Sequence, residues 1–104
     1  MIRKAFVMSI HQGKKEEYSQ RHNPIWKRLE LVLKDHGVHN YSIFHDSETD
    51  ALFAYVEVES VDKWDAIADT PECKEWWAFM KDIMPANSDN SPVASELEQV
   101  FHLK

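Results

Sequence analysis

The stretch VHNYSIFH-DSETD-ALFAYVEVE, residues 38–59, decides the fold of this chain. Two runs that are rich in apolar and aromatic residues, 38–45 and 51–59, flank five polar residues, 46–50. Runs of this length and composition predict strands, and the short polar segment between them predicts a hairpin turn. The middle of the chain is therefore expected to be an antiparallel strand pair.

Toward the N-terminus, residues 3–10 predict another strand, and Gly13 interrupts the regular structure after it. Residues 14–35 have apolar side chains at helical spacing and predict a helix that ends at Gly37. Pro24 lies inside this helix and lacks a backbone N–H. The helix should therefore kink or pause directly after His22.

Toward the C-terminus, Ser60 and Thr70 stand where each can cap a helix, and Pro71 occupies the first helical position after Thr70. We expect helices over 61–69 and from Pro71 to about Met84, and a last strand over 96–103. The order is then β-α-β-β-α-β with the second helical region split. This order predicts an α+β fold of the ferredoxin-like sandwich type, as a single domain over residues 1–104.

The predicted strands carry apolar residues on both faces, for example Phe53 and Tyr55 opposite Leu52, Ala54 and Val56. One face of an antiparallel sheet is usually polar when it meets water. A second apolar face must be shielded from water, and the simplest way is to pack it against the sheet of a second copy of the chain. We therefore expect a homodimer, a dimeric α+β barrel.

Composition excludes several classes of function. The 104 residues carry a net charge of −6, which argues against a nucleic-acid partner. The chain has two glycines, which argues against a glycine-rich phosphate loop, and its single cysteine allows no internal disulfide. No apolar stretch reaches membrane-spanning length, and the apolar run near the N-terminus is too short for a signal peptide. The expected location is cytoplasmic.

The stretch YSQRHNPIW, residues 18–26, offers the best candidates for chemistry. Tyr18 and His22 lie four residues apart, on one face of a helix. An unperturbed imidazole has a pKa of about 6.5 and can exchange protons at neutral pH. The competing interpretation is a half-exposed helix histidine with no role. Five further histidines form no cluster with Cys or carboxylates, so neither a metal site nor a cofactor is expected.

Further candidates lie on the strands and in the second half of the chain. Tyr41 offers a phenol, although tyrosines on strands are more often core residues. Trp76 and Trp77 are adjacent and point about 100° apart on a helix, so one should be core and the other should line a cavity or an interface. The loop 84–92 could close over a pocket. Cys73 has no base beside it and reads as a small buried apolar residue.

Several segments together resemble the L-rhamnose mutarotase family, and the resemblance spans essentially the whole chain. They are EY at 17–18, RHNPIW at 21–26, NY at 40–41, WW at 76–77, MPAN at 84–87 and DNSPV at 89–93. The resemblance implies a cytoplasmic homodimer of ferredoxin-like units that interconverts the α and β anomers of L-rhamnose without a cofactor. It also implies that His22 is the proton donor and that Tyr18, Tyr41, Trp76 and Trp77 bind the sugar.

Two other functions are compatible with the same architecture. A small cofactor-free monooxygenase would oxidise an aromatic substrate and leave sugar anomers unchanged. A non-catalytic dimeric α+β barrel that binds a small ligand would keep its function when His22 is replaced. Anomer exchange needs only an acid, a base and a polar pocket, and acid–base catalysis of this kind supplies about 10²–10⁴-fold.

Overall fold

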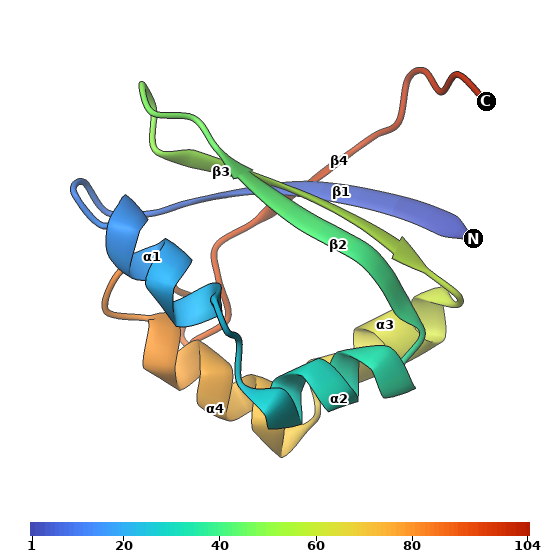
Figure 1. Ribbon diagram of the computed structural model, residues 1–104, viewed down its shortest axis with the longest axis horizontal. Coiled ribbons are helices and arrows are strands. Elements are labelled where there is room, and N and C mark those ends of the chain that lie inside the picture. The colour runs from blue at the N-terminus through green and yellow to red at the C-terminus, as the bar shows by residue number, and fades with distance from the viewer.

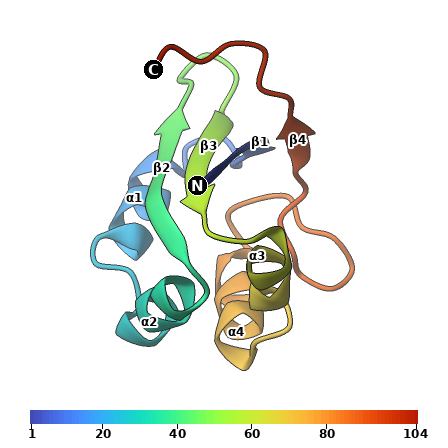
Figure 2. The same cartoon turned by 90° about the vertical axis from the view of Figure 1, so that its right-hand side faces the viewer.

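The computed structural model describes residues 1–104 as one antiparallel sheet with all four helices packed on one face, which we call the inner face (Figures 1 and 2). The strand order in the sheet is β2-β3-β1-β4. The predicted α+β, ferredoxin-like fold class is confirmed. The elements are β1 Ile2–Ser9, α1 Lys15–His22, α2 Lys27–Asp35, β2 Val38–His45, β3 Ala51–Val58, α3 Val61–Ile67, α4 Pro71–Met80 and β4 Ser95–Leu97.

The predicted hairpin is formed by β2 and β3, and a network of hydrogen bonds builds its turn. The Asp46 carboxylate accepts hydrogen bonds from the Glu48 backbone N–H at 3.0 Å and from the Thr49 hydroxyl at 2.9 Å. The register between the strands shifts between His39 and Ser42. Such a bulge changes which side chains face inward, and it brings Tyr41 onto the inner face, where it packs against the core.

The prediction of one helix over 14–35 is wrong, because the chain forms two helices there. Helix α1 ends at His22, as the position of Pro24 predicts, and α2 begins only at Lys27. Proline disfavours helical geometry in the residue before it, and Asn23 has φ −133° and ψ 85°. The predicted pause at His22 is therefore a complete break.

The second helical region follows its capping signals. The hydroxyls of Ser60 and Thr70 accept hydrogen bonds from the N–H groups of Lys63 and Cys73, both at 3.3 Å. Helix α3 ends at Ile67, two residues before the predicted end. Helix α4 ends at Met80, not at residue 84. Strand β4 covers 95–97, so it begins one residue before the predicted strand 96–103 and ends six residues earlier.

The core lies between the inner face of the sheet and the helices. Its most completely buried side chains are Leu52, Val56, Val58 and Ile83. Cys73 is buried here as expected, and burial raises the pKa of its thiol to about 11, so it stays protonated and unreactive at neutral pH. No helix of the structure is long and apolar enough to cross a membrane.

Candidate functional site

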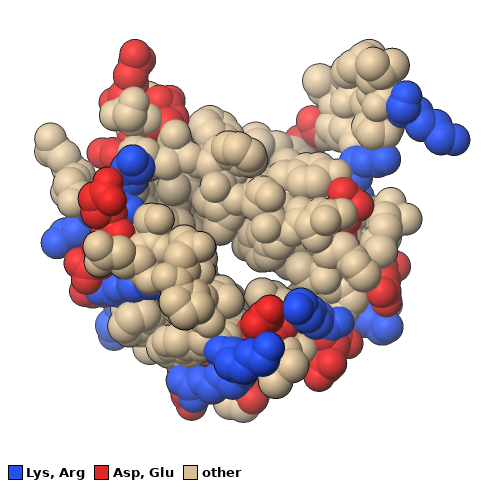
Figure 3. Space-filling model, viewed as in Figure 1, with Lys and Arg blue, Asp and Glu red and all other residues tan.

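A cavity of about 870 Å³ lies between the inner face of the sheet and the helices. Figure 3 shows the molecule hollowed at this place, with tan atoms around the hollow and most charged atoms on the outer surface. Most of the residues that line it are apolar, and the lining includes residues from all four strands and all four helices. All five of the predicted site residues, Tyr18, His22, Tyr41, Trp76 and Trp77, lie in this lining.

Three of these residues form one end of the cavity, which we call the histidine end: Tyr18, His22 and Trp76. The rings of Tyr18 and His22 stack with their centroids 4.3 Å apart. The edge of His22 meets the ring of Trp76 at 5.1 Å, with an angle of 88° between the planes. The spacing of four residues on α1 thus places a phenol and an imidazole together, and α4 adds the indole.

The hydrogen bonding of His22 fixes which of its nitrogens can react. Nδ1 lies 2.8 Å from the backbone carbonyl oxygen of Tyr18. Because a carbonyl can only accept, Nδ1 must donate, and the neutral imidazole then carries its lone pair on Nε2. Burial lowers the pKa of His22 from its usual 6.5, and the bond to the Tyr18 carbonyl opposes this shift. At neutral pH the ring is therefore neutral, with Nε2 ready to accept a proton.

The polar atoms that the protein leaves unpaired open into the cavity. The hydroxyls of Tyr18 and Tyr41 and Nε2 of His22 have no hydrogen-bond partner in the chain, and no buried side-chain polar atom lacks such a partner. These three atoms must therefore be accessible, and the cavity is the space that their residues line. Burial raises the pKa of both phenols above their usual value of 10, so both stay protonated and can donate.

Three further aromatic residues of the lining form a second cluster, which we call the phenylalanine end: Phe6, Tyr41 and Trp64. The Phe6 ring lies 6.3 Å from Tyr41 and 6.1 Å from Trp64, and Tyr41 lies 5.9 Å from Trp64. Figure 1 places α1 under one end of the sheet and α3, which carries Trp64, under the other. The two clusters therefore bound the cavity from opposite sides.

The tryptophan pair behaves largely as predicted. Trp76 is buried and belongs to the core, while Trp77 is half-buried. Both line the cavity. Because they point in different directions from α4, they form different parts of its wall. Trp26 supports Trp76 from behind, with an edge contact at 5.1 Å.

The loop 84–92 lies at the cavity, as expected, and its own hydrogen bonds hold its shape. The Asn87 side chain donates to the Ser91 hydroxyl at 3.1 Å and to the Pro92 carbonyl at 3.3 Å. The Asn87 N–H donates to the Ser91 carbonyl at 2.8 Å. Ser91 and Asn90 belong to the lining and add polar groups to it.

Sequence analysis missed three contributors to the site: Phe6, Trp64 and Arg21. Trp64 stands three and four residues before Ile67 and Ala68, a helical spacing that could have placed all three on one lining face. Phe6 alternates with Met8 on β1, which indicates a shared face. Arg21 has no such signal, because its partners outside α1, Phe79 and Asp82, lie about 60 residues away. No group of three or more His, Cys, Asp or Glu side chains is arranged to hold a metal ion.

The fold and the cavity define a small ferredoxin-like α+β protein with an aromatic-walled pocket and a half-buried histidine, His22, in its lining. A putative antibiotic biosynthesis monooxygenase from Bordetella bronchiseptica has the same fold, with a TM-score of 0.68, 13% identity and coverage of 95% of this chain and 96% of the other. At that identity the likeness concerns the fold alone. The sequence pattern of L-rhamnose mutarotase matches residues 3–103. This chain belongs to the L-rhamnose mutarotase family.

Individual relatives agree with this assignment. The L-rhamnose mutarotase of Shigella flexneri serotype 5b is 59% identical over 103 residues, which cover 99% of each chain. The crystal structure of the L-rhamnose mutarotase of Formosa agariphila superimposes with a TM-score of 0.93, at 44% identity and full coverage of both chains. The predicted family is therefore confirmed.

Proposed function

We propose that this protein is an isomerase that interconverts the α and β anomers of L-rhamnose, with His22 as the proton-transfer group. Membership of the L-rhamnose mutarotase family supports the reaction and the substrate. The observation that supports the residue is the free Nε2 of a neutral, half-buried imidazole on the wall of the cavity.

The reaction requires one proton to move from one sugar oxygen to another. Neutral His22 takes the proton of the anomeric hydroxyl O1 with Nε2. The C1–O5 bond breaks as O1 becomes a carbonyl oxygen, and the imidazolium gives the proton to O5. After rotation about the C1–C2 bond, the same steps in reverse close the ring on the other face. No electron or proton is gained or lost overall, so no co-reactant is required.

The other residues would bind and orient the sugar. The phenols of Tyr18 and Tyr41 donate to sugar oxygens, because their raised pKa values keep them protonated. Trp76 and Trp77 present ring faces to the apolar C–H groups and the methyl group of a 6-deoxy sugar. A bound sugar held by such contacts spends less time in unreactive orientations, which favours the chemical step.

Saturation-transfer NMR on equilibrated L-rhamnose tests this function directly. Catalytic amounts of the protein should accelerate magnetisation exchange between the two anomeric protons, with no added metal or nucleotide. A chelator should leave the rate unchanged. A rate equal to the spontaneous one, or an activity that a chelator abolishes and a divalent metal restores, would contradict the proposal.

A homodimer belongs to the same proposal, together with a cytoplasmic location, and the outer face of the sheet supports it. The register places Val7, Phe53 and Phe44 in one row across three strands. Phe44 is 68% exposed and Phe53 44% exposed, in an apolar row that water disfavours. The tail after β4 runs along this side of the molecule and exposes Val100, Phe101 and Leu103 (Figure 1). A second copy packed on this face would cover all of them.

A matched pair of variants tests the dimer. Light scattering at micromolar concentration should give twice the chain mass for the wild type and a single chain mass for Phe53→Lys. Leu31 on α2 is also exposed, at 50%, but lies away from the sheet. Leu31→Lys should therefore remain dimeric. A monomeric wild type, or a dimer that Phe53→Lys does not weaken, would exclude this interface.

A further inference from the structure

Helix α1 carries two of the candidate site residues but has little packing of its own to hold it. It has eight residues, and Tyr18 is the only one that is buried. The rest of the helix is polar, with Lys, Glu, Ser, Gln and Arg side chains around it. Short helices gain most of their stability from an apolar face that packs on a neighbour. The position of α1, and with it that of His22, therefore depends on other contacts.

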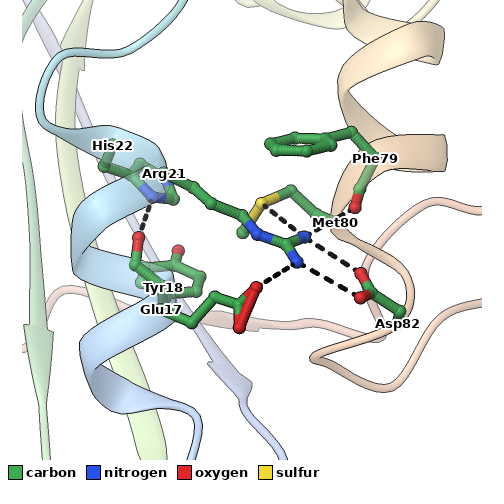
Figure 4. A network of polar contacts seen from close by, with 7 residues as sticks. All are labelled: Glu17, Tyr18, Arg21, His22, Phe79, Met80 and Asp82. Atoms are coloured by element: carbon green, nitrogen blue, oxygen red, sulfur yellow. Dashed lines mark hydrogen bonds and ion pairs between the residues drawn. The ribbon is translucent and has the colours of Figure 1, made fainter.

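Arg21 supplies contacts of this kind, because its side chain spans from α1 to the end of α4 (Figure 4). Its Nη1 donates to the Phe79 carbonyl oxygen at 2.7 Å and to Oδ1 of Asp82 at 2.9 Å. Its Nη2 donates to Oδ2 of Asp82 at 3.2 Å and to Oε1 of Glu17 at 2.7 Å. Two parallel bonds to one carboxylate fix direction as well as distance.

The surroundings of Arg21 are those of a structural side chain. Only 12% of it is exposed. The guanidinium lies 4.4 Å from the centre of the Phe79 ring, a cation–π contact. The Phe79 carbonyl is among the last four of α4, which have no partner within a helix, so the arginine also caps that helix.

The influence of Arg21 on its neighbour His22 is one of position. Two carboxylates, those of Asp82 and Glu17, balance its charge at hydrogen-bond distance. The pKa of His22 is lowered by burial, and the opposing influence is the Tyr18 carbonyl. Its contacts join α1 to the end of α4, and these are the two helices whose His22 and Trp76 rings meet edge-on at 5.1 Å.

We propose that Arg21 is a positioning residue, which holds the histidine end in register by joining α1 to the C-terminal end of α4 through Asp82 and the Phe79 carbonyl. This inference rests on the proposed role of His22 in anomer exchange. In this proposal His22 transfers the proton, and Arg21, the residue before it, holds His22 in position.

The two carboxylates on Arg21 provide a matched pair of variants. Asp82→Ala removes the two carboxylate bonds that join Arg21 to the chain after α4 and leaves the bond to the Phe79 carbonyl, whereas Glu17→Ala removes a bond that lies within α1. Misplacement of a catalytic group by about 1 Å can cost up to about 10²-fold in rate. We expect Asp82→Ala to lower kcat for anomer exchange about tenfold, with little change in KM. Glu17→Ala should keep a kcat close to that of the wild type.

Variants of Arg21 itself complete the test. Arg21→Met keeps the apolar stem, loses every hydrogen bond and should lower kcat at least as much as Asp82→Ala. Arg21→Lys keeps the charge but cannot bond the carbonyl and both Asp82 oxygens together, so it should recover only part of the activity. Thermal melts followed by circular dichroism define the range in which each variant is folded, and all rates are compared there. Equal kcat for Asp82→Ala and the wild type, or a rise in KM alone, would overturn the proposal.

A readout without sugar separates this proposal from the proposed function. The NMR shifts of the His22 ring protons depend on the ring current of Trp76, which lies on the other helix. They should move in Asp82→Ala and Arg21→Met and stay in place in Glu17→Ala. If the wild type exchanged no anomers, the proposed function would fail while this shift pattern still tested Arg21. Unmoved shifts in all three variants would refute the positioning role.

Discussion

The two ends of the cavity are built from similar aromatic side chains, yet only one of them contains a group that can move a proton. At the histidine end, His22 is stacked on Tyr18 and touches Trp76. At the phenylalanine end, Tyr41 is surrounded by Phe6 and Trp64 and carries only a phenol whose pKa burial has raised.

This difference separates chemistry from recognition within one small domain. A phenol that stays protonated over the working pH range can hold a sugar hydroxyl but cannot cycle a proton at a useful rate. A neutral imidazole can accept a proton and return it. Variants of His22 should therefore change kcat, and variants of the residues that bind the sugar should change KM.

The largest effect is expected from His22→Gln. Glutamine keeps hydrogen-bonding capacity but cannot carry the proton, so the exchange rate at saturating rhamnose should fall by about 10²-fold or more. The fold should survive, because His22 stands at the end of α1 and makes a single hydrogen bond, to the Tyr18 carbonyl. Saturation-transfer NMR across a series of sugar concentrations measures both kcat and KM.

His36→Gln is the matched control for that experiment. His36 stands at the end of α2, and its Nδ1 bonds the Val32 carbonyl four residues earlier at 2.7 Å, as His22 does with Tyr18. It does not line the cavity. It should keep full activity. Near-normal exchange by His22→Gln would exclude His22 as the proton-transfer group and would turn attention to Tyr18.

The pH dependence of the exchange rate is expected to be the next largest effect. The lowered pKa of His22 keeps the ring neutral at pH 7, so kcat should be level there and fall as the pH drops through this pKa, below 6.5. The fall should approach about tenfold per pH unit, as for a single base. The nearby phenol of Tyr18 has a raised pKa and does not titrate in this range. A kcat that increases on acidification would mean that His22 begins the cycle as the imidazolium.

Trp77→Ala should produce a smaller defect, which raises KM and leaves kcat largely unchanged. Loss of an aromatic face costs about 1.4 kcal/mol of sugar binding, which corresponds to about a tenfold higher KM. Because Trp77 is half-buried against the core, the variant should also melt at a lower temperature. Rates are therefore compared well below its melting temperature. A drop in kcat as deep as that of His22→Gln, at unchanged KM, would contradict the distinction between the proton-transfer residue His22 and the residues that bind the sugar.

Local signals in the sequence predicted most of this fold. Gly37 ends α2 with φ +75°, and a Cβ at this position would approach the Cβ of Glu59 to 2.9 Å, so glycine is required there. Ser60 and Thr70 cap their helices as expected. The errors concern extent, as in the break at 23–26 and the short β4. A helical pattern that continues past a proline does not show whether the axis bends or the helix ends.

The candidate site was predictable where its residues are close in sequence. Tyr18 and His22 are related by one helical turn, and Trp76 and Trp77 are adjacent. The contact of His22 with Trp76, by contrast, joins residues more than 50 positions apart, and so does the bridge from Arg21 to Asp82. Such contacts depend on how α1 and α4 pack on the sheet. A single sequence contains no local pattern that specifies this packing.

The smallest effect is expected from Tyr41→Phe, which examines the phenylalanine end alone. The Tyr41 hydroxyl bonds no protein group, so its removal leaves no partner unpaired and the fold should keep its stability. Only a hydrogen bond to the sugar is lost, at about 1 kcal/mol, and KM should rise about fivefold with kcat retained. Tyr55→Phe is the control, since the Tyr55 hydroxyl donates to Glu57 at 3.0 Å outside the cavity, and its KM should not change. If Tyr41→Phe lowered kcat at constant KM, the phenol would take part in proton transfer, and the two ends of the cavity would share the chemistry.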